Sequence, residues 1–448
     1  MPPLSRRRFF AVSAAAAALG AAPAALAQPD PLLHAAIRSH LGYSVGFRRK
    51  FGTGLYAMPG TAAPVAKVLS THQAIVRRLA TLSADTPTLA LLHWLDEQSR
   101  LHAWLIGAEG VVARGTAGSY TELGFVLSAL RVDVRTATRA PVKRGVPRIP
   151  PRQSDAALSP EAALVRTRDL LLPGDIGRAL ADRRGRLLIL PARDTGAAPY
   201  AALPLGEAMF VDRWASVIVP DIETLADPMR VFSSEQLRPG NALLVGNPDL
   251  SADTDYEWRA IPAAEEEVAA FARMFAVPPH RVLTGRAATR DRVLAAIDNY
   301  GEASIVYLAT HGVANSVNPM DGSFLALSGG HLFGRDLRGK RFEAWAAWHP
   351  LVILSACQTA LGKTFDGGTY GVARGWISAG AGQVIASLWN VDDNATRALM
   401  VEFAGHAFVS RKLPEEALRL AQLAARASFP ADPAAWASFS VFGAPATA

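Results

Sequence analysis

Two residues able to act as a nucleophile and its base stand just after apolar segments of the chain. His311 follows the run Ile305–Ala309 after one residue, and Cys357 follows the run Leu351–Ser355 after one residue. Reactive groups of a parallel α/β sheet collect beyond the carboxyl ends of its strands, so neighbouring strands would bring the imidazole and the thiol together. A histidine can take the thiol proton, and the thiolate can then attack a carbonyl carbon. We therefore expect Cys357 as nucleophile and His311 as base and acid.

The glycine next to the histidine extends this hypothesis. Because Gly312 has no side chain, its backbone N–H can approach a developing oxyanion, with the N–H of Cys357 as the second donor. The alternative is that Cys357 is a buried small hydrophobe and His311 an ordinary loop histidine. Cys357 is the only cysteine of the chain, and both residues fall at predicted strand ends, which favours the chemical interpretation.

Two carboxylates follow a further apolar segment, residues 384–388. Asp392 and Asp393 could hold a basic side chain of a substrate beside the predicted site. They could equally cap the helix that we expect to begin near Asn394, since aspartate is among the best capping residues.

Other kinds of site find little support. Residues 366–371 are rich in glycine but lack the lysine and the Ser/Thr of a phosphate-binding loop, so we expect a flexible loop that leads into a helix near Thr369. The ten histidines are scattered, and one cysteine cannot build a structural zinc site. The nucleophile elbow G-x-S-x-G of serine hydrolases does not occur. We therefore expect no metal and no organic cofactor.

The elements that must position the two residues alternate between strands and helices. Helices are predicted over Pro262–Phe275, with proline in the first turn, and over residues 290–300, capped by Thr289. Strands are predicted over residues 187–190, 216–219, 242–245, 305–309, 351–355 and 384–388. Apolar strands separated by helices indicate an α/β fold with a mostly parallel sheet covered on both faces. Residues 28–85 show helical periodicity, short strands follow from Thr88, and residues 136–160 have the composition of a surface linker.

The beginning of the chain predicts export. Three arginines at positions 6–8 precede an alanine-rich apolar run over residues 9–22, and Ala-Leu-Ala at 25–27 suits a signal peptidase that cuts before Gln28. The arginines resemble a twin-arginine signal. They also supply three of the seven net positive charges of the 448-residue chain, so the remaining surface gives no reason to expect nucleic acid. We expect a periplasmic or secreted protein without a membrane anchor after cleavage.

The segments around the two residues also carry a family resemblance. They resemble those of the CHAT domain, a caspase-like peptidase domain often fused to tetratricopeptide repeats, and the histidine precedes the cysteine by 46 residues, close to the ~50 of caspases. Further matching segments are residues 199–204, 244–248, 318–327, 379–381, 387–393 and 436–439.

The resemblance implies a caspase/separase-type fold and an endopeptidase dyad. The chain would then comprise a signal peptide (1–27), a helical segment (28–85), a degenerate caspase-like half without a cysteine (86–240) and a catalytic half (241–446). The partner would be a protein or peptide substrate of the dyad His311 and Cys357. A non-catalytic protein-binding module on the same fold is the alternative. The repeats themselves are not visible in this sequence.

Overall fold

The computed structural model describes residues 30–52, 63–137, 142–143, 158–299, 303–315, 317–338, 342–357, 359–365, 368–390 and 392–447. The predicted signal segment 1–27 lies outside the described residues, as does most of the predicted linker. Within the described ranges, no helix is both long and apolar enough to cross a bilayer.

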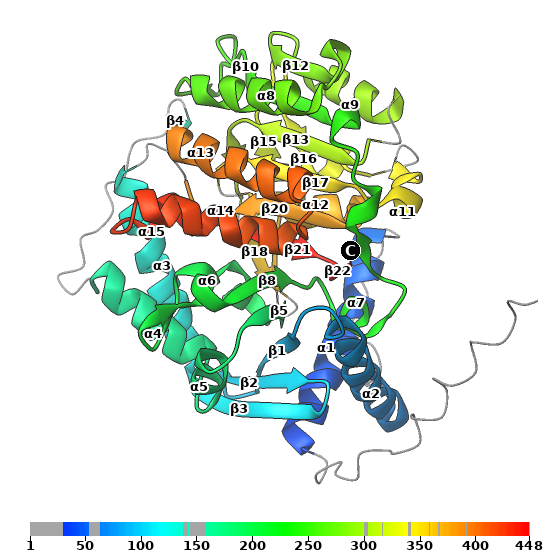
Figure 1. Ribbon diagram of the computed structural model, residues 1–448, viewed down its shortest axis with the longest axis vertical. Helices are drawn as coiled ribbons and strands as arrows, with labels where there is room; N and C mark the ends of the chain where they lie inside the picture. Colours follow the sequence, from blue (N-terminus) through cyan, green and yellow to red (C-terminus); the bar gives the residue numbers. More distant parts are fainter. Residues whose placement is uncertain are drawn as a thin grey trace, which may run out of the picture.

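A single large sheet runs through the centre of the molecule (Figure 1). Among the described residues it has eleven strands, in the spatial order β12 (Val282–Gly285), β10 (Leu243–Pro248), β13 (Ile305–Ala309), β17 (Leu351–Ser355), β20 (Gln383–Ser387), β21 (Phe439–Gly443), β8 (Trp214–Ile218), β5 (Gly185–Leu190), β1 (Thr88–Leu95), β2 (Arg100–Gly107) and β3 (Gly110–Ser119). The predicted strands 305–309 and 351–355 have the observed bounds, and the predicted α/β class is confirmed.

The sheet consists of two blocks that run in opposite directions. In the C-terminal block, β12, β10, β13, β17 and β20 are parallel to one another. In the N-terminal block, β8, β5 and β1 are parallel, and β2 and β3 extend the edge as an antiparallel meander. Strand β21 joins the blocks because it pairs antiparallel with β20 and parallel with β8. The carboxyl ends of the two blocks therefore lie at opposite edges of the sheet.

Helices cover both faces of the C-terminal block. α8 (Pro262–Phe275), α13 (Asp393–Ala404) and α14 (Pro414–Ser428) pack side by side across one face (Figure 1). Right-handed crossovers place α9 (Arg290–Asn299) and α12 (Val372–Ala379) on the other face. α8 buries Ala264, Val268 and Phe271 along one stripe, and its bounds are those predicted.

The segment predicted to be helical at the start contains α1 (Pro31–Gly52) and α2 (Val65–Leu82). α2 packs on α7 (Ile222–Ala226) and β1 through Val68, Ile75 and Leu79. The other described helices and strands are α3 (Tyr120–Ala137), α4 (Pro160–Leu171), α5 (Ile176–Ala181), α6 (Phe210–Arg213), α10 (Pro319–Gly322), α11 (Trp345–Trp348), α15 (Pro433–Trp436), β4 (Val142–Lys143), β6 (Pro204–Leu205), β7 (Ala208–Met209), β9 (Phe232–Ser233), β11 (Tyr256–Glu257), β14 (Gly312–Val313), β15 (Phe324–Leu325), β16 (Leu332–Phe333) and β22 (Ala446–Thr447).

A hairpin follows Cys357 where a loop was expected. β18 (Gly362–Phe365) pairs with β19 (Gly368–Gly371), and the helix begins at Val372 rather than near Thr369. The two backbones meet closely at the base of the hairpin, since a Cβ on Gly371 would lie 1.8 Å from the Leu361 carbonyl oxygen. Glycine at this position allows the two strands to approach each other, so the glycine-rich composition indicated a strand pairing and not the loop that we predicted.

Candidate active site

The register of the sheet brings His311 and Cys357 to neighbouring strand ends. β13 and β17 are neighbouring parallel strands, and Ala309 pairs with Ser355. His311 and Cys357 each lie two residues beyond this pair. The contact continues past the strands, because the backbone N–H of Thr310 donates to the Ser355 carbonyl at 3.2 Å. The histidine and the cysteine therefore follow adjacent strand ends at one edge of the C-terminal block, as the sequence predicted.

Gly312 touches the backbone of the cysteine. A Cβ at this position would lie 2.3 Å from the carbonyl oxygen of Cys357 and 3.2 Å from Cγ2 of Thr359. Real Cβ atoms do not approach oxygen so closely, so any other residue would push the two loops apart. The structure thus shows a steric requirement for glycine at position 312 that the sequence did not reveal.

The ring of His311 is oriented by a loop that sequence reasoning did not single out. Its Nε2 lies 2.7 Å from the carbonyl oxygen of Arg259, and since a carbonyl only accepts, Nε2 carries the hydrogen. In the neutral ring the lone pair is then on Nδ1. Burial lowers the pKa of His311, against the opposing effect of its bond to Arg259, so the neutral form predominates at pH 7. A backbone carbonyl has no signature in sequence, which is why this partner was missed.

A buried carboxyl lies beneath the two strands. Glu267 on α8 accepts a hydrogen bond from the Tyr307 hydroxyl at 2.5 Å and also bonds the side chain of Ser355. Burial raises the pKa of Glu267 to about 7. Tyr307 lies on β13 and Ser355 ends β17, so this carboxyl ties together the strands that carry His311 and Cys357.

The two aspartates of the sequence analysis are helix caps. Asp392 accepts hydrogen bonds from the backbone N–H groups of Asn394 and Ala395 at 3.0 and 3.1 Å, at the start of α13. Asp393 accepts from the N–H of Ala263 at 2.9 Å, in the first turn of α8. The predicted capping of α13 is confirmed for Asp392. A contact of either carboxylate with a substrate stays a prediction.

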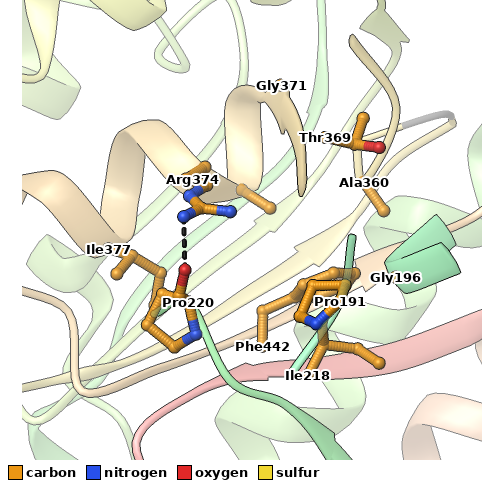
Figure 2. A pocket seen from close by; sticks show the side chains of 11 residues that line it. Pro191, Gly196, Ile218, Pro220, Ala360, Thr369, Gly371, Arg374, Ile377 and Phe442 are labelled. Carbon is orange, nitrogen blue, oxygen red and sulfur yellow. Dashed lines mark hydrogen bonds between the residues drawn. The ribbon is translucent and has the colours of Figure 1, made fainter. Parts of the chain in front are cut away.

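A small depression lies between the two blocks (Figure 2). One wall comes from β19 and α12, and the other comes from the segments that follow β5 and β8. Arg374 on α12 closes one side by donating to the carbonyl oxygen of Pro220. Ala360, three residues after Cys357, belongs to the same lining. The remaining lining is mostly apolar, with Pro191, Ile218, Ile377 and Phe442. The segment after the cysteine is therefore packed against the N-terminal block.

No three histidine, cysteine, aspartate or glutamate side chains gather as metal ligands within the ranges that the structure describes. His311 and Cys357 follow adjacent strand ends, and the backbone of Gly312 lies against the carbonyl group of Cys357. Such a site can transfer protons and form a covalent bond to sulfur.

Comparisons with known proteins agree with this architecture. A family model described as the CHAT domain matches residues 162–444, well over half of the chain. The chain is 25% identical over 365 residues to tetratricopeptide repeat protein 28 of Mus musculus, and 26% identical over 364 residues to that of Homo sapiens. These alignments cover 69% and 68% of this chain but only 14% of each relative.

Among solved structures, a chain of the separase–securin complex of Saccharomyces cerevisiae matches with a TM-score of 0.54 and 11% identity. The match covers 93% of this chain and 34% of that chain. The likeness shows the fold, and it confirms the separase-type α/β architecture that the sequence motifs implied.

Proposed function

Because this chain belongs to the CHAT domain family, we propose that it is a cysteine endopeptidase that cleaves protein or peptide substrates. The observation that carries the proposal is the pairing of β13 with β17, which puts His311 and Cys357 at adjacent strand ends. Cys357 is half-buried. A nucleophile in that position can meet a substrate while its base stays fixed by the loop of Arg259.

The reaction begins with a proton transfer from the thiol of Cys357 to Nδ1 of His311. Nε2 keeps its hydrogen and its bond to the Arg259 carbonyl throughout, so the ring does not need to turn. The imidazolium that forms is stabilised by that carbonyl. The thiolate attacks the carbonyl carbon of the scissile peptide bond and forms the carbon–sulfur bond of a tetrahedral intermediate.

The negative charge then develops on the substrate oxygen. The backbone N–H groups of Gly312 and Cys357 are the proposed donors to it, and one such donor typically contributes about 10²–10³ in rate. The close contact of these two backbones keeps the donors together. When the carbon–nitrogen bond breaks, His311 gives its proton to the leaving amine. Water, deprotonated by His311, hydrolyses the thioester and releases the second product.

We also propose that the protein works outside the cytoplasm, exported by the signal predicted at residues 1–27. Replacing Arg6 and Arg7 with lysine should retain the protein in the cytoplasm, because the export machinery recognises the arginine pair. Cell fractionation tests this, and an unchanged distribution would contradict the twin-arginine prediction.

The peptidase activity is tested on a pool of denatured proteins by mass spectrometry of new termini. The wild-type protein should produce termini that Cys357→Ala and His311→Ala do not. Identical sets of termini from wild type and Cys357→Ala would overturn the proposal and leave the fold as a binding module. Slow alkylation of Cys357 that does not depend on His311 would support the same conclusion.

A further inference from the structure

An aromatic cluster adjoins His311 through the ring of Trp258. It consists of Tyr256, Trp258, Phe324, His331 and Phe333, from the loop between β10 and α8 and from the segments β15 and β16. Within it, the rings of Trp258 and His311 have centroids 5.1 Å apart and planes inclined by 34°. Trp258 precedes Arg259, whose carbonyl accepts from Nε2 of the same imidazole. Two successive residues thus fix one ring, at its edge and at its face.

A carboxylate anchors the indole in turn. The Nε1–H of Trp258 donates to Oδ2 of Asp253 at 2.5 Å, and Nε2 of His331 lies 3.3 Å from the same oxygen. The other oxygen accepts from the backbone N–H groups of Asp255 and Tyr256 at 2.8 and 3.2 Å. Burial alone would raise the pKa of Asp253, but these bonds lower it, the bond from Trp258 most strongly. The carboxylate is therefore charged at neutral pH and holds the indole with a charge-assisted bond.

We propose that Trp258 is a positioning residue for His311, with Asp253 as the anchor of its indole. The inference rests on the proposed function, because it gives Trp258 a role in the proton transfer between Cys357 and His311. The carbonyl of Arg259 is a single contact about which the imidazole can still tilt. The indole against its face removes that freedom, and His311 keeps only 8% of its surface exposed. A proton transfer needs such alignment, since a misplacement of about 1 Å can cost about 100-fold in rate.

The single cysteine allows a test that needs no substrate. Iodoacetamide can label one site in this chain, and the mass of the intact protein reports its rate. At pH 6 a thiol with an unshifted pKa near 8.5 is almost wholly protonated, so fast labelling reports assistance by His311. The variants are Trp258→Ala, Trp258→Phe, Asp253→Asn and His311→Ala. Phe333→Ala is the matched control, because it removes another ring of the same cluster, one that contacts Phe324 and His331.

Trp258→Ala should slow labelling by about tenfold or more, towards the rate of His311→Ala. Phe333→Ala should keep it within about threefold of wild type, whereas Trp258→Phe, which keeps a ring beside the imidazole but loses the bond to Asp253, should have an intermediate effect. Asp253→Asn should have an intermediate effect. Wild-type labelling of Trp258→Ala, or equal slowing by Phe333→Ala, would overturn the inference.

Two controls separate the failures. If the His311→Ala variant is labelled as fast as wild type, the proposed dyad fails. If His311→Ala slows labelling but Trp258→Ala does not, the dyad stands and this inference fails. If Trp258→Ala shows no cooperative unfolding in urea, Trp258→Leu replaces it, because leucine refills part of the volume without an aromatic face.

Discussion

The two blocks of the sheet share an architecture and differ in what they carry at the carboxyl ends of their strands. In the C-terminal block, β13 and β17 lead into His311 and Cys357. In the N-terminal block, β5 and β8 lead into Pro191 and Pro220, which line an apolar depression against α12 and β19. The same position in the topology thus holds reactive groups in one block and an internal contact in the other. This difference indicates that the N-terminal block supports the segment that follows Cys357.

Buried titratable groups on the two sides of the sheet have pKa values shifted in opposite directions. On the N-terminal side, burial lowers the pKa of His40 on α1 and of His93 on β1 to about 4. The C-terminal block buries an acid, Glu267, whose pKa is raised to about 7. Protonation of these histidines and of Glu267 therefore changes stability in opposite directions with pH, which allows their contributions to be distinguished.

The largest loss of stability is expected from removing a buried ion pair that joins the N-terminal block to a helix on the other block. Arg186 on β5 and Glu415 on α14 form a buried ion pair at 3.1 Å, with side chains 4% and 1% exposed. Arg186 also donates to the Ala446 carbonyl at 2.6 Å. Glu415→Gln would leave a buried guanidinium without its counter-charge, and we expect a loss of about 3–5 kcal/mol in unfolding free energy. Urea denaturation measures it, and a loss below about 1 kcal/mol would show that the contact contributes little to joining the blocks.

Acid should weaken the N-terminal block. Nε2 of His93 donates to the Leu171 carbonyl at 2.8 Å, and Nε2 of His40 donates to the His93 carbonyl at 2.7 Å. Since their folded pKa is depressed, stability is intact above pH 6.5 and falls between pH 6.5 and 4, where only the unfolded chain gains the proton. Each histidine accounts for about 3 kcal/mol. His93→Gln keeps a hydrogen-bond donor for the Leu171 carbonyl but has no titrating group. The part of the acid-induced loss of stability that is due to His93 should therefore disappear, as urea titrations at pH 7, 5.5 and 4 would show. An equal loss in both proteins would contradict the assignment.

Glu267 should make the stability of the protein depend on pH in the opposite direction. Its folded pKa lies above its unfolded value, so its contribution to stability is complete below about pH 4.5 and is lost as the pH rises through 7. The loss at higher pH is about 3 kcal/mol. Glu267→Gln imitates the protonated acid beside Tyr307 and Ser355 and should remove this slope between pH 4.5 and 8. A slope that persists in the variant would assign the effect to another group.

The comparison also shows what the sequence could reveal. Buried parallel strands are continuous apolar runs, so β13 and β17 and the residues that follow them were predicted from local pattern alone. Strand β21 was missed, because its role as the junction of two opposed blocks depends on pairings with β8 and β20 that are distant in sequence. The carbonyl of Arg259 and the ring of Trp258 were missed for a related reason. Both act on His311 through a loop fold that composition and spacing do not encode.

The role of Gly312 at the proposed active site can be tested by comparison with Gly115, a glycine of the N-terminal block. A Cβ on Gly312 would lie 2.3 Å from the carbonyl oxygen of Cys357. A Cβ on Gly115 in β3 would lie equally close, 2.3 Å, to the carbonyl oxygen of Pro173. Both alanine variants should therefore lose stability. Only Gly312→Ala should slow peptide cleavage, by about 100-fold, because it separates the two proposed oxyanion donors. Equal slowing by Gly115→Ala in folded protein would mean that the loss is a general effect of backbone displacement.

The smallest effect concerns Asp392, and it separates a structural from a binding role. Its carboxylate accepts two N–H groups at the start of α13, so Asp392→Ala should lower the unfolding free energy by about 1 kcal/mol. Asparagine caps a helix about as well as aspartate but has no charge. Asp392→Asn should therefore keep both the stability and the pattern of residues found before the cleaved bonds. If stability is kept but cleavage after arginine and lysine is lost selectively, the carboxylate binds a basic side chain in addition to capping, because only the charge has changed.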